Sequence, residues 1–342
     1  MSKPLLSIVI PTHNSKKTIY DLLSSISISN FRHFKEIEVL IIDDCSKDQT
    51  VTIVKNIIPY LKFDLFLKRL NKNVGPARAR NQGVKKAVGK YILFLDSDVI
   101  LAKNTLNCAF QFAKTGKFRA FTGIWHYRQY TKKFFPQFKA LRDWAYWFIE
   151  REKNARYYLF STRIAGIEKK LFNQIGGFNI NYSEPTIEDI ELTYRIEKIK
   201  KIKFSPKLLV YHEFEDFWPI AVKYFKRSRD WIQLYQKRLR FDPVATSKKE
   251  AVKSITAGLF LFSLLLIFIS NFFIYPATIS FLFFSLLEFK FWIFLLKKRG
   301  VVFLFKSIPI SIALYLIINA GSVYGLILSY LKRNHFYNRF FF

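Results

Sequence analysis

The sequence predicts an α/β domain with a mostly parallel sheet, followed by a C-terminal α-helical transmembrane region. Three short apolar runs read as strands and alternate with three helix-like segments. The runs lie at residues 5–11, 38–44 and 91–98, and the segments at 17–29, 49–60 and 76–87. Fully apolar strands that alternate with helices are typical of a parallel sheet covered on both faces. From about Ser254 onward the chain is apolar over long stretches, which predicts the membrane region.

The composition indicates an anionic partner at a membrane. The 342 residues are enough for two structural units and carry 55 Lys and Arg against 25 Asp and Glu, a formal net charge of +30. Nucleic acid, a phosphorylated substrate and an acidic membrane face would all attract such a chain. The 38 Phe residues and the apolar C-terminal part favour an anionic membrane, and the sequence shows no nucleic-acid-binding motif. We therefore expect no nucleic acid as a partner.

The cysteines and the first residues bear on the cellular compartment. Cys45 and Cys108 match no metal-binding spacing, and we expect free thiols in a reducing compartment. Residues 1–11 lack the charged start and long apolar core of a signal peptide. The N-terminal domain is therefore expected in the cytoplasm, attached to a multi-pass membrane region.

All three predicted strands end in polar residues. Ligands of open α/β sheets bind beyond the carboxyl ends of the strands, so these side chains are expected to converge on one crevice. They are Thr12, Asn14, Asp43, Asp44, Asp96 and Asp98. A local role stays open for each, since Asn14 and Ser46 could equally cap the helices that follow them.

Asp96 and Asp98 are the most informative of these residues. Side chains alternate along an extended chain, so both carboxylates are expected on one side of the strand and Ser97 on the other. Neighbouring carboxylates repel each other and lose solvation, and a divalent cation relieves both costs. Their hard oxygen atoms suit Mg2+ or Mn2+, which can then hold a substrate diphosphate. The alternative is a solvated turn whose acids cap the next helix.

Two later segments combine basic and aromatic side chains. Within residues 134–158 one helical face is apolar, which predicts a core-facing helix or, alternatively, a helix at a membrane surface or beside an acceptor. That face consists of Phe134, Phe138, Leu141, Trp144, Ala145 and Phe148. Within residues 218–241, aromatic residues lie among many Lys and Arg residues and lead into the apolar region. Attraction to anionic lipid favours an interfacial position for this second segment.

Three apolar stretches form the predicted membrane region. They lie at residues 255–270, 277–287 and 308–331, and a span needs about 20 apolar residues. The first two stretches fit an out-and-back hairpin, with the basic cluster at 297–299 on the cytoplasmic side. The interrupted segment 291–305 is expected as an interfacial helix. The number of spans is left open at two or three.

Four polar or small residues of this region also carry expectations. Glu288 and Lys290 lie near a helix end, where their side chains can extend to the water interface without any functional role. Gly321 and Gly325 are separated by three residues, a spacing that predicts close contact between two helices.

Four motifs follow one another along the first part of the chain. They are SIVIPTHN at 7–14, VLIIDDCSKDQT at 39–50, NVGPARARNQGVKKAVGKYILFLDSDV at 73–99 and IGGFNINYSEPTIEDIELTYRI at 175–196. In order and spacing they resemble the motifs of family 2 glycosyltransferases with the GT-A fold, over roughly residues 5–211. With the composition, this predicts a Rossmann-like GT-A domain at 1–215, a basic amphipathic juxtamembrane segment at 216–253 and transmembrane helices at 254–332.

The resemblance assigns donor-binding roles to the first three motifs. Pro11, Thr12 and Asn14 would hold the nucleoside, and Asp43 or Asp44 would accept a hydrogen bond from its base. A carboxylate suits the imino N–H of uracil or thymine, and we expect a UDP-linked sugar as the donor. Arg80 would approach the diphosphate or the sugar, although a surface arginine on a helix is the simpler interpretation.

The resemblance also implies the metal site and the catalytic acid–base pair. Asp98 would coordinate Mg2+ or Mn2+, Asp96 would contact the ribose or the metal, and His212 is a weaker metal candidate. Asp189 would be the base that takes the acceptor's proton, and Glu188 would support it. The alternative for these two acids is the first turn of a helix, where acidic residues are favourable without any catalytic role.

The resemblance implies an inverting glycosyltransferase that moves a sugar from a nucleoside-diphosphate sugar to a lipid-linked or membrane-presented acceptor. Surface or cell-envelope glycan synthesis is the process that fits. Two enzyme alternatives stay open, transfer to a polyprenyl phosphate and processive polysaccharide synthesis. A non-catalytic nucleotide-sugar-binding membrane scaffold is a further alternative, because a fold does not establish chemistry.

Overall fold

The computed structural model describes residues 3–151, 158–182, 184, 186–242 and 246–340, and only the backbone of residues 332–340. The chain forms two compact units, which are described separately. The first comprises Met1–Tyr130 and Arg156–Glu213, and the second Thr131–Ala155 and Phe214–Phe342. Residues 131–155, which lie inside the predicted domain 1–215, thus pack with the C-terminal helices.

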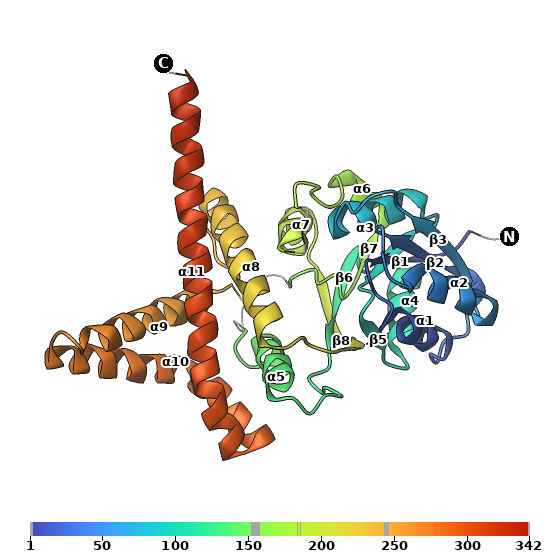
Figure 1. Ribbon diagram of the computed structural model, residues 1–342. Coiled ribbons are helices and arrows are strands. Elements are labelled where there is room, and N and C mark those ends of the chain that lie inside the picture. Colours follow the sequence, from blue (N-terminus) through green and yellow to red (C-terminus); the bar gives the residue numbers. More distant parts are fainter. Residues whose placement is uncertain (1–2, 152–157, 183, 185, 243–245, 341–342) are drawn as a thin grey trace. The chain divides into compact units, whose positions relative to one another are not determined.

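The first unit is built on a mixed eight-stranded sheet in the order β3-β2-β1-β4-β7-β6-β8-β5 (Figure 1). The strands are β1 (Leu6–Thr12), β2 (Ile37–Asp43), β3 (Asp64–Arg69), β4 (Tyr91–Leu95), β5 (Val99–Leu101), β6 (Ala120–Trp125), β7 (Ile164–Glu168) and β8 (Lys203–His212). Strands β1 to β4 are parallel, β7 is antiparallel to β4 and β6, and β5 is antiparallel to β8. The predicted α/β domain with a mostly parallel sheet is confirmed, and its three predicted strands are β1, β2 and β4.

Helices cover the sheet and bring the later motifs to it. They are α1 (Ile19–Ser27), α2 (Thr50–Ile57), α3 (Pro76–Lys86), α4 (Thr105–Thr115), α6 (Lys169–Gln174) and α7 (Glu188–Glu197), with short 3-10 turns at η1 (Phe34–Glu36) and η2 (Ile58–Tyr60). One buried cluster joins α3, α6 and α7 to the strands through Val9, Phe94, Phe172 and Leu192. Gly83 lets α3 approach β1, since a Cβ there would lie 2.4 Å from Val9 Cγ1. Helices α3 and α7 are thereby held over the same sheet.

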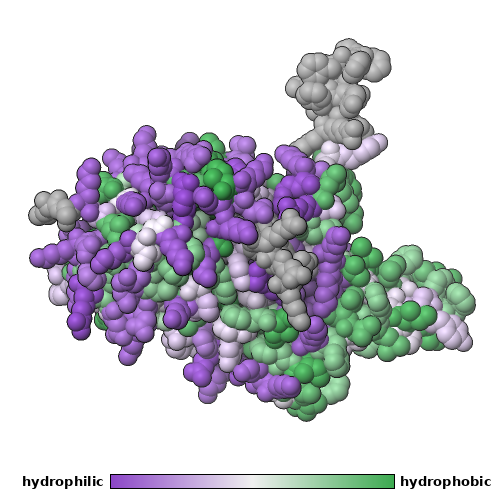
Figure 2. Space-filling model, turned by 180° about the vertical axis from the view of Figure 1, so that it is seen from behind, coloured by the Kyte–Doolittle hydropathy of each residue, from purple (hydrophilic) through white to green (hydrophobic). Residues whose placement is uncertain are grey.

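The second unit is helical. Its elements are α5 (Phe134–Phe148), α8 (Phe217–Arg238), α9 (Lys248–Leu266), η3 (Asn271–Phe273), α10 (Ile274–Arg299) and α11 (Val301–Phe340). Hydrophobic side chains cover the pair formed by α9 and α10 (Figure 2). Among the described residues, two segments are long and apolar enough to cross a membrane, Asn271–Arg299 and Val301–Leu331. Length and composition alone set this result.

Two expectations for this unit need correction at the level of single helices. The segment 291–305 is not one interfacial helix, because Gly300, at a φ of 82°, separates the end of α10 from the start of α11. On α5, Phe138, Leu141 and Ala145 are buried as expected, but Phe148 is exposed. Residues 152–157 of the predicted segment 134–158 lie outside the described residues.

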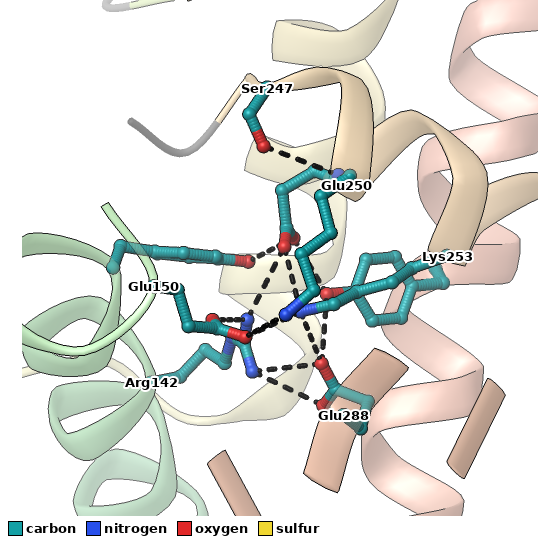
Figure 3. Close-up of polar contacts among 9 residues, drawn as sticks. Arg142, Glu150, Ser247, Glu250, Lys253 and Glu288 are labelled. Atoms are coloured by element: carbon teal, nitrogen blue, oxygen red, sulfur yellow. Dashed lines mark hydrogen bonds and ion pairs between the residues drawn. The ribbon is translucent and has the colours of Figure 1, made fainter. Parts of the chain in front are cut away.

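Charged side chains also occupy the interior of the second unit (Figure 3). Glu288 is fully buried and accepts hydrogen bonds from Arg142 Nη1 at 3.0 and 3.1 Å. Its Oε1 also lies 2.6 Å from Lys253 Nζ. The expectation that Glu288 extends to water is therefore wrong, whereas Lys290 is exposed. The sequence pattern could not show this, because the partner Arg142 is far away in the chain.

Candidate active site

Asp43, at the end of β2, is saturated by contacts within the protein. The residue is fully buried, and its Oδ2 accepts a hydrogen bond from the backbone N–H of Ser46 at 3.0 Å and lies 3.6 Å from Arg69 Nε. Its Oδ1 accepts hydrogen bonds from the Ser46 hydroxyl and, at 3.2 Å, from the Thr12 hydroxyl. A carboxylate offers about four lone-pair positions, so these four donors leave little capacity for a ligand.

Asp44 holds the loop that leads into α3. Its Oδ1 accepts a hydrogen bond from the backbone N–H of Val74 at 2.7 Å, and its Oδ2 accepts one from Gly75 at 2.8 Å. Gly75 has a φ of 85°, a conformation that side chains with a Cβ rarely adopt. These two bonds leave about half of the carboxylate's accepting capacity for a base or ribose. Of the two candidate acids, Asp44 is therefore the better placed to accept from a ligand.

Asn14 links the loop after β1 to the loop after β2. It lies in the left-handed region with a φ of 52°, and its backbone N–H donates to Ser46 Oγ at 2.9 Å. Its side-chain Oδ1 accepts from the backbone N–H of Lys47 at 2.8 Å. Pro11 and Thr12 complete β1 as buried residues. Of the three strand ends that the sequence predicted to meet, those of β1 and β2 are joined by these contacts.

Asp96 and Asp98 have different partners, contrary to the expectation that both point to one side of a strand. Strand β4 ends at Leu95, and residues 96–98 form a turn before β5. Asp96 accepts a hydrogen bond from Arg80 Nη2 at 2.8 Å. Asp98 Oδ2 lies 3.2 Å from Nε2 of His212, because β5 pairs with β8 and brings Val99 opposite His212. Asp96 thus contacts Arg80, whereas Asp98 contacts His212.

Arg80 is a buried bridge rather than a surface arginine. Its guanidinium donates to Asp96 and, through Nη1 at 3.1 Å, to Glu188 Oε1, and it lies over the ring of Phe178. Burial opposes the charged form, but the attraction of Asp96 and Glu188 outweighs it and raises the pKa of Arg80. Arg80 therefore connects the end of β4 to the first turn of α7.

Glu188 and Asp189 begin α7 and have different surroundings. Glu188 is buried, and its Oε2 accepts from the backbone N–H of Thr186 at 3.0 Å while Oε1 binds Arg80. Asp189 is half-buried, and its Oδ1 accepts from the backbone N–H of Ile190 at 2.8 Å. The expected support of Asp189 by Glu188 stays a prediction, because the two Glu188 oxygens bind Arg80 and the backbone of Thr186.

A divalent cation fits the donor set at the start of β5 and the end of β8. Asp98 keeps half of its side chain exposed, and the adjacent His212 supplies an imidazole nitrogen. Among the described residues, no three His, Cys, Asp or Glu side chains gather closely enough to hold a metal alone. Mg2+ and Mn2+ are commonly held by one or two protein ligands together with substrate phosphates. Asp98 and His212 would therefore hold the cation together with a bound diphosphate.

Two positioning residues were not found from the sequence. The Asn81 side chain accepts from the Phe178 backbone N–H at 2.9 Å and donates to the Phe178 carbonyl at 2.8 Å. Arg195 donates to the carbonyl oxygens of Ile175 and Gly177, each at 2.6 Å. Both fix the loop before α7, whose residues 183 and 185 lie outside the described residues. No local signal marks these roles, because both side chains act on a loop that is distant in sequence or irregular.

The family model named Glycosyl transferase family 2 matches residues 7–176. Poly(ribitol-phosphate) beta-N-acetylglucosaminyltransferase TarS of Staphylococcus aureus is 41% identical over 107 residues, which make up 31% of this chain and 18% of TarS. The matched stretch thus spans less than a fifth of that relative. Residues 7–176 of this chain therefore belong to glycosyltransferase family 2.

Solved structures agree with this fold. The structure of Staphylococcus aureus TarS 1–349 in complex with UDP-GlcNAc is 26% identical, with a TM-score of 0.50, and covers 68% of this chain and 66% of that chain. A mannosyltransferase from Pyrobaculum calidifontis, in complex with GDP-Man and Mn2+, is 17% identical with a TM-score of 0.60. It covers 95% of this chain and 88% of that chain. The chain therefore carries a GT-A glycosyltransferase domain, as its motifs predict.

Proposed function

We propose that this protein is a membrane-attached inverting glycosyltransferase that transfers the sugar of a UDP-sugar to a membrane-presented acceptor. The observation that carries the proposal is the connected set of acids at the sheet edge. Asp98 lies beside His212, and the bridge Asp96–Arg80–Glu188 leads from the same turn to the helix start that bears Asp189. This arrangement supports a transfer site within the first unit.

The proposed mechanism is a single displacement at the sugar's anomeric carbon. Asp189 takes the proton from the attacking acceptor hydroxyl, and a positioned base of this kind contributes typically 10²–10⁴-fold to a rate. A cation at Asp98 and His212 would neutralise the charge that develops on the departing diphosphate. Arg80 holds Glu188 and Asp96 in place, so the base and the cation side keep a fixed relation. Inversion follows because one displacement reverses the configuration.

Uridine as the donor base is supported by Asp44. Its carboxylate retains accepting capacity and can receive the imino N–H of uracil, a donor that adenine lacks. Asp43 supports the loop instead, because its four contacts occupy it. The related structure of TarS, solved with UDP-GlcNAc, agrees with this choice.

A membrane-presented acceptor, as in surface glycan synthesis, is supported by charge and by the second unit. The chain carries a net charge of +30, and its C-terminal helices include two segments apolar enough for a membrane. The name of the relative TarS specifies poly(ribitol-phosphate), an acceptor that carries phosphate. A polyprenyl phosphate would satisfy the same charge, so product analysis has to separate the two acceptors.

The test is release of nucleotide from a panel of UDP-, GDP- and dTDP-sugars by the purified full-length protein in detergent, with and without Mn2+. We expect Mn2+-dependent release from a UDP-sugar, lost in Asp98→Ala and kept in Asp21→Ala. Asp21 is a matched control because it is exposed on α1. A single lipid-linked sugar as product would indicate transfer to a polyprenyl phosphate, and a long polymer would indicate a processive synthase. Calorimetric absence of UDP binding would contradict the proposal.

A further inference from the structure

Helix α11 contains the more hydropathic candidate span, yet it packs along the charged helix α8 within the second unit (Figure 1). A Cβ at Gly321 would lie 2.4 Å from the carbonyl oxygen of Phe225, and one at Gly325 would lie 2.5 Å from that of Arg229. The two glycines therefore let the backbones touch, which confirms the predicted helix–helix contact. The partner is the basic helix α8 and not another apolar helix.

The register of these contacts shows which part of α11 runs alongside α8. Phe225 is level with Gly321 and Arg229 with Gly325, so the two helices run in the same direction with a constant offset. With this offset, α8 accompanies α11 from about Ala313 to the end of the candidate span at Leu331. The other part of that span, residues 301–312, rises only about 18 Å, against about 30 Å of bilayer hydrocarbon.

The charges of α8 argue against burial of this helix pair in hydrocarbon. Over the stretch that faces α11, α8 carries Lys223, Lys226, Arg227, Arg229 and Asp230. One charged side chain at the bilayer centre costs about 2.5–3.5 kcal/mol on insertion scales, so several together are prohibitive. Basic side chains beside anionic headgroups are instead favourable by about 1 kcal/mol each. The pair α8 and α11 therefore fits the membrane surface.

The hairpin of α9 and α10 has the opposite character. Residues 255–287 include no charged side chain, and the hairpin's surface is hydrophobic (Figure 2). At its tip, Phe268, Ile269 and Phe272 are 92%, 78% and 67% exposed. The uncharged parts of its two helices, 255–266 and 274–287, rise about 18 and 21 Å. The hairpin is thus deeper than one leaflet but shorter than the hydrocarbon core.

One face of the inner half of α10 is covered by protein, while Phe289 and Leu296 of that half are exposed. Phe291 and Leu295 are fully buried, and Phe291 packs against Phe138 and under the Arg142 guanidinium of α5. The inner half of the candidate span Asn271–Arg299 therefore offers only part of its surface to a bilayer. The uncharged stretch of α10, residues 274–287, is too short to cross on its own.

The buried charges mark the level at which the hairpin leaves the polar part of the unit (Figure 3). Lys253 on α9 and Glu288 on α10 face each other at 2.6 Å, directly before and after the uncharged stretch. Arg142 of α5 also binds Glu288, which ties α5 to the same level. Both ends of the hairpin continue into basic residues, and basic flanks favour the cytoplasmic face. The two ends therefore belong on one side of the membrane.

We propose that the second unit is monotopic: the α9–α10 hairpin enters the cytoplasmic leaflet and returns, while α8 and α11 lie along the surface of an anionic bilayer. No described helix then crosses the membrane, in place of the two or three spans that hydropathy predicts. The inference rests on the membrane attachment proposed above and not on the transferase chemistry. It also leaves α5 held at the lipid surface, where a lipid-borne acceptor is presented.

The test is the side from which single cysteines react with a membrane-impermeant maleimide. The full-length protein, with Cys45 replaced by Gly and Cys108 by Ser, would carry Lys248→Cys at the hairpin base, Asn271→Cys at its tip or Tyr330→Cys near the end of α11. Labelling would be compared in intact cells, in inverted vesicles and after detergent solubilisation, which reports that each cysteine is reactive in the folded protein. Quenching of a bimane at position 271 by lipids brominated deep in the acyl chain gives an independent depth.

We expect Asn271→Cys to stay at least ten-fold less reactive in both membrane preparations than in detergent, and its bimane to be quenched by the deep bromines. Lys248→Cys and Tyr330→Cys should react in inverted vesicles and not in intact cells. Reaction of Asn271→Cys in intact cells would show a spanning hairpin, and reaction of Tyr330→Cys there would show that α11 crosses. Ready reaction of Asn271→Cys in inverted vesicles would show no insertion. Each of these outcomes overturns the proposal without touching the question of nucleotide release.

Discussion

Glu150 should be the acidic residue that makes the second unit sensitive to pH. Burial disfavours its charge, but Arg142, Lys253 and Lys249 outweigh this effect and lower the pKa of Glu150 to about 2. An unfolded glutamate has a pKa of about 4.3, so the charged form contributes about 3 kcal/mol of stability at pH 7. Because the folded pKa is the lower one, this contribution is complete above the unfolded pKa and is lost as the pH falls toward 2. About half of this contribution should remain at pH 3.

Urea unfolding in detergent micelles, followed by tryptophan fluorescence, measures this contribution. Glu150→Gln should lower the free energy of unfolding by about 3 kcal/mol at pH 7, and the gap to the unsubstituted protein should shrink to about half at pH 3. Glu215→Gln is the matched control, because Glu215 pairs with Lys223 at the surface of the same unit and such pairs contribute about 0–1 kcal/mol. If Glu150→Gln is as stable as the unsubstituted protein at pH 7, or if the difference in stability does not narrow in acid, the stabilising role of the charged Glu150 is contradicted.

Three further predictions test the contacts around the site and between the helices. Arg80→Met should lower the free energy of unfolding of the first unit by about 3–5 kcal/mol, because it leaves Glu188 buried without its partner. Arg80→Lys should lower it by about 1–3 kcal/mol, because lysine cannot donate to both carboxylates as the guanidinium does. Urea unfolding measures both values, and equal losses would contradict the bridging role of Arg80. Asp44→Asn removes one of two acceptors for backbone N–H groups and should weaken UDP binding in calorimetry at least ten-fold, with unchanged affinity as the contrary result. Gly321→Leu should lower the free energy of unfolding of the second unit by about 1–3 kcal/mol or more, because the new side chain clashes with α8. Val323→Leu, on the exposed face of α11, should leave it unchanged. If both variants are as stable as the unsubstituted protein, the contact between α8 and α11 is contradicted.

The parts of the fold that the sequence predicted are those with strong local patterns. Strands β1, β2 and β4 are continuous apolar runs, buried from both faces, and their turns carry polar residues at the expected places. Strand β3 escaped prediction because it is an edge strand with alternating exposure and two charged ends. Strands β6 and β7 were also missed, since their pairing with β4 and β8 depends on partners distant in the sequence.

The candidate site divides in the same way. Spacing and family resemblance located Asp98, Asp189 and Asp44, each next to the end of a strand or the start of a helix. They could not reveal that Arg80 joins Asp96 to Glu188, because the last two are distant in the chain and meet only in the folded protein. The expectation that Asp96 and Asp98 share a side failed because strand β4 ends at Leu95, before either carboxylate, whereas the predicted strand continued to residue 98.

The helical unit shows where hydropathy alone misleads. A hydropathy pattern counts the residues of α11 as a span, but it cannot register that Gly321 and Gly325 lie against the backbone of a charged helix. It also treats Glu288 as a side chain that reaches water, whereas Arg142 and Lys253 hold it inside the unit. Both features arise from residues 131–155 and 217–238, which precede the apolar region in the sequence.

In the proposed transfer reaction, Asp98 holds the cation and Asp189 takes the proton of the acceptor. The most direct measurement compares UDP binding and UDP-sugar turnover, across a Mn2+ titration, in the unsubstituted protein, Asp98→Asn and Asp189→Asn. We expect Asp98→Asn to lose both the Mn2+ dependence of UDP binding and turnover. Asp189→Asn should bind UDP as before but turn over about 10²–10⁴-fold more slowly. Undiminished turnover by Asp189→Asn, or unchanged Mn2+-dependent UDP binding by Asp98→Asn, would contradict these roles.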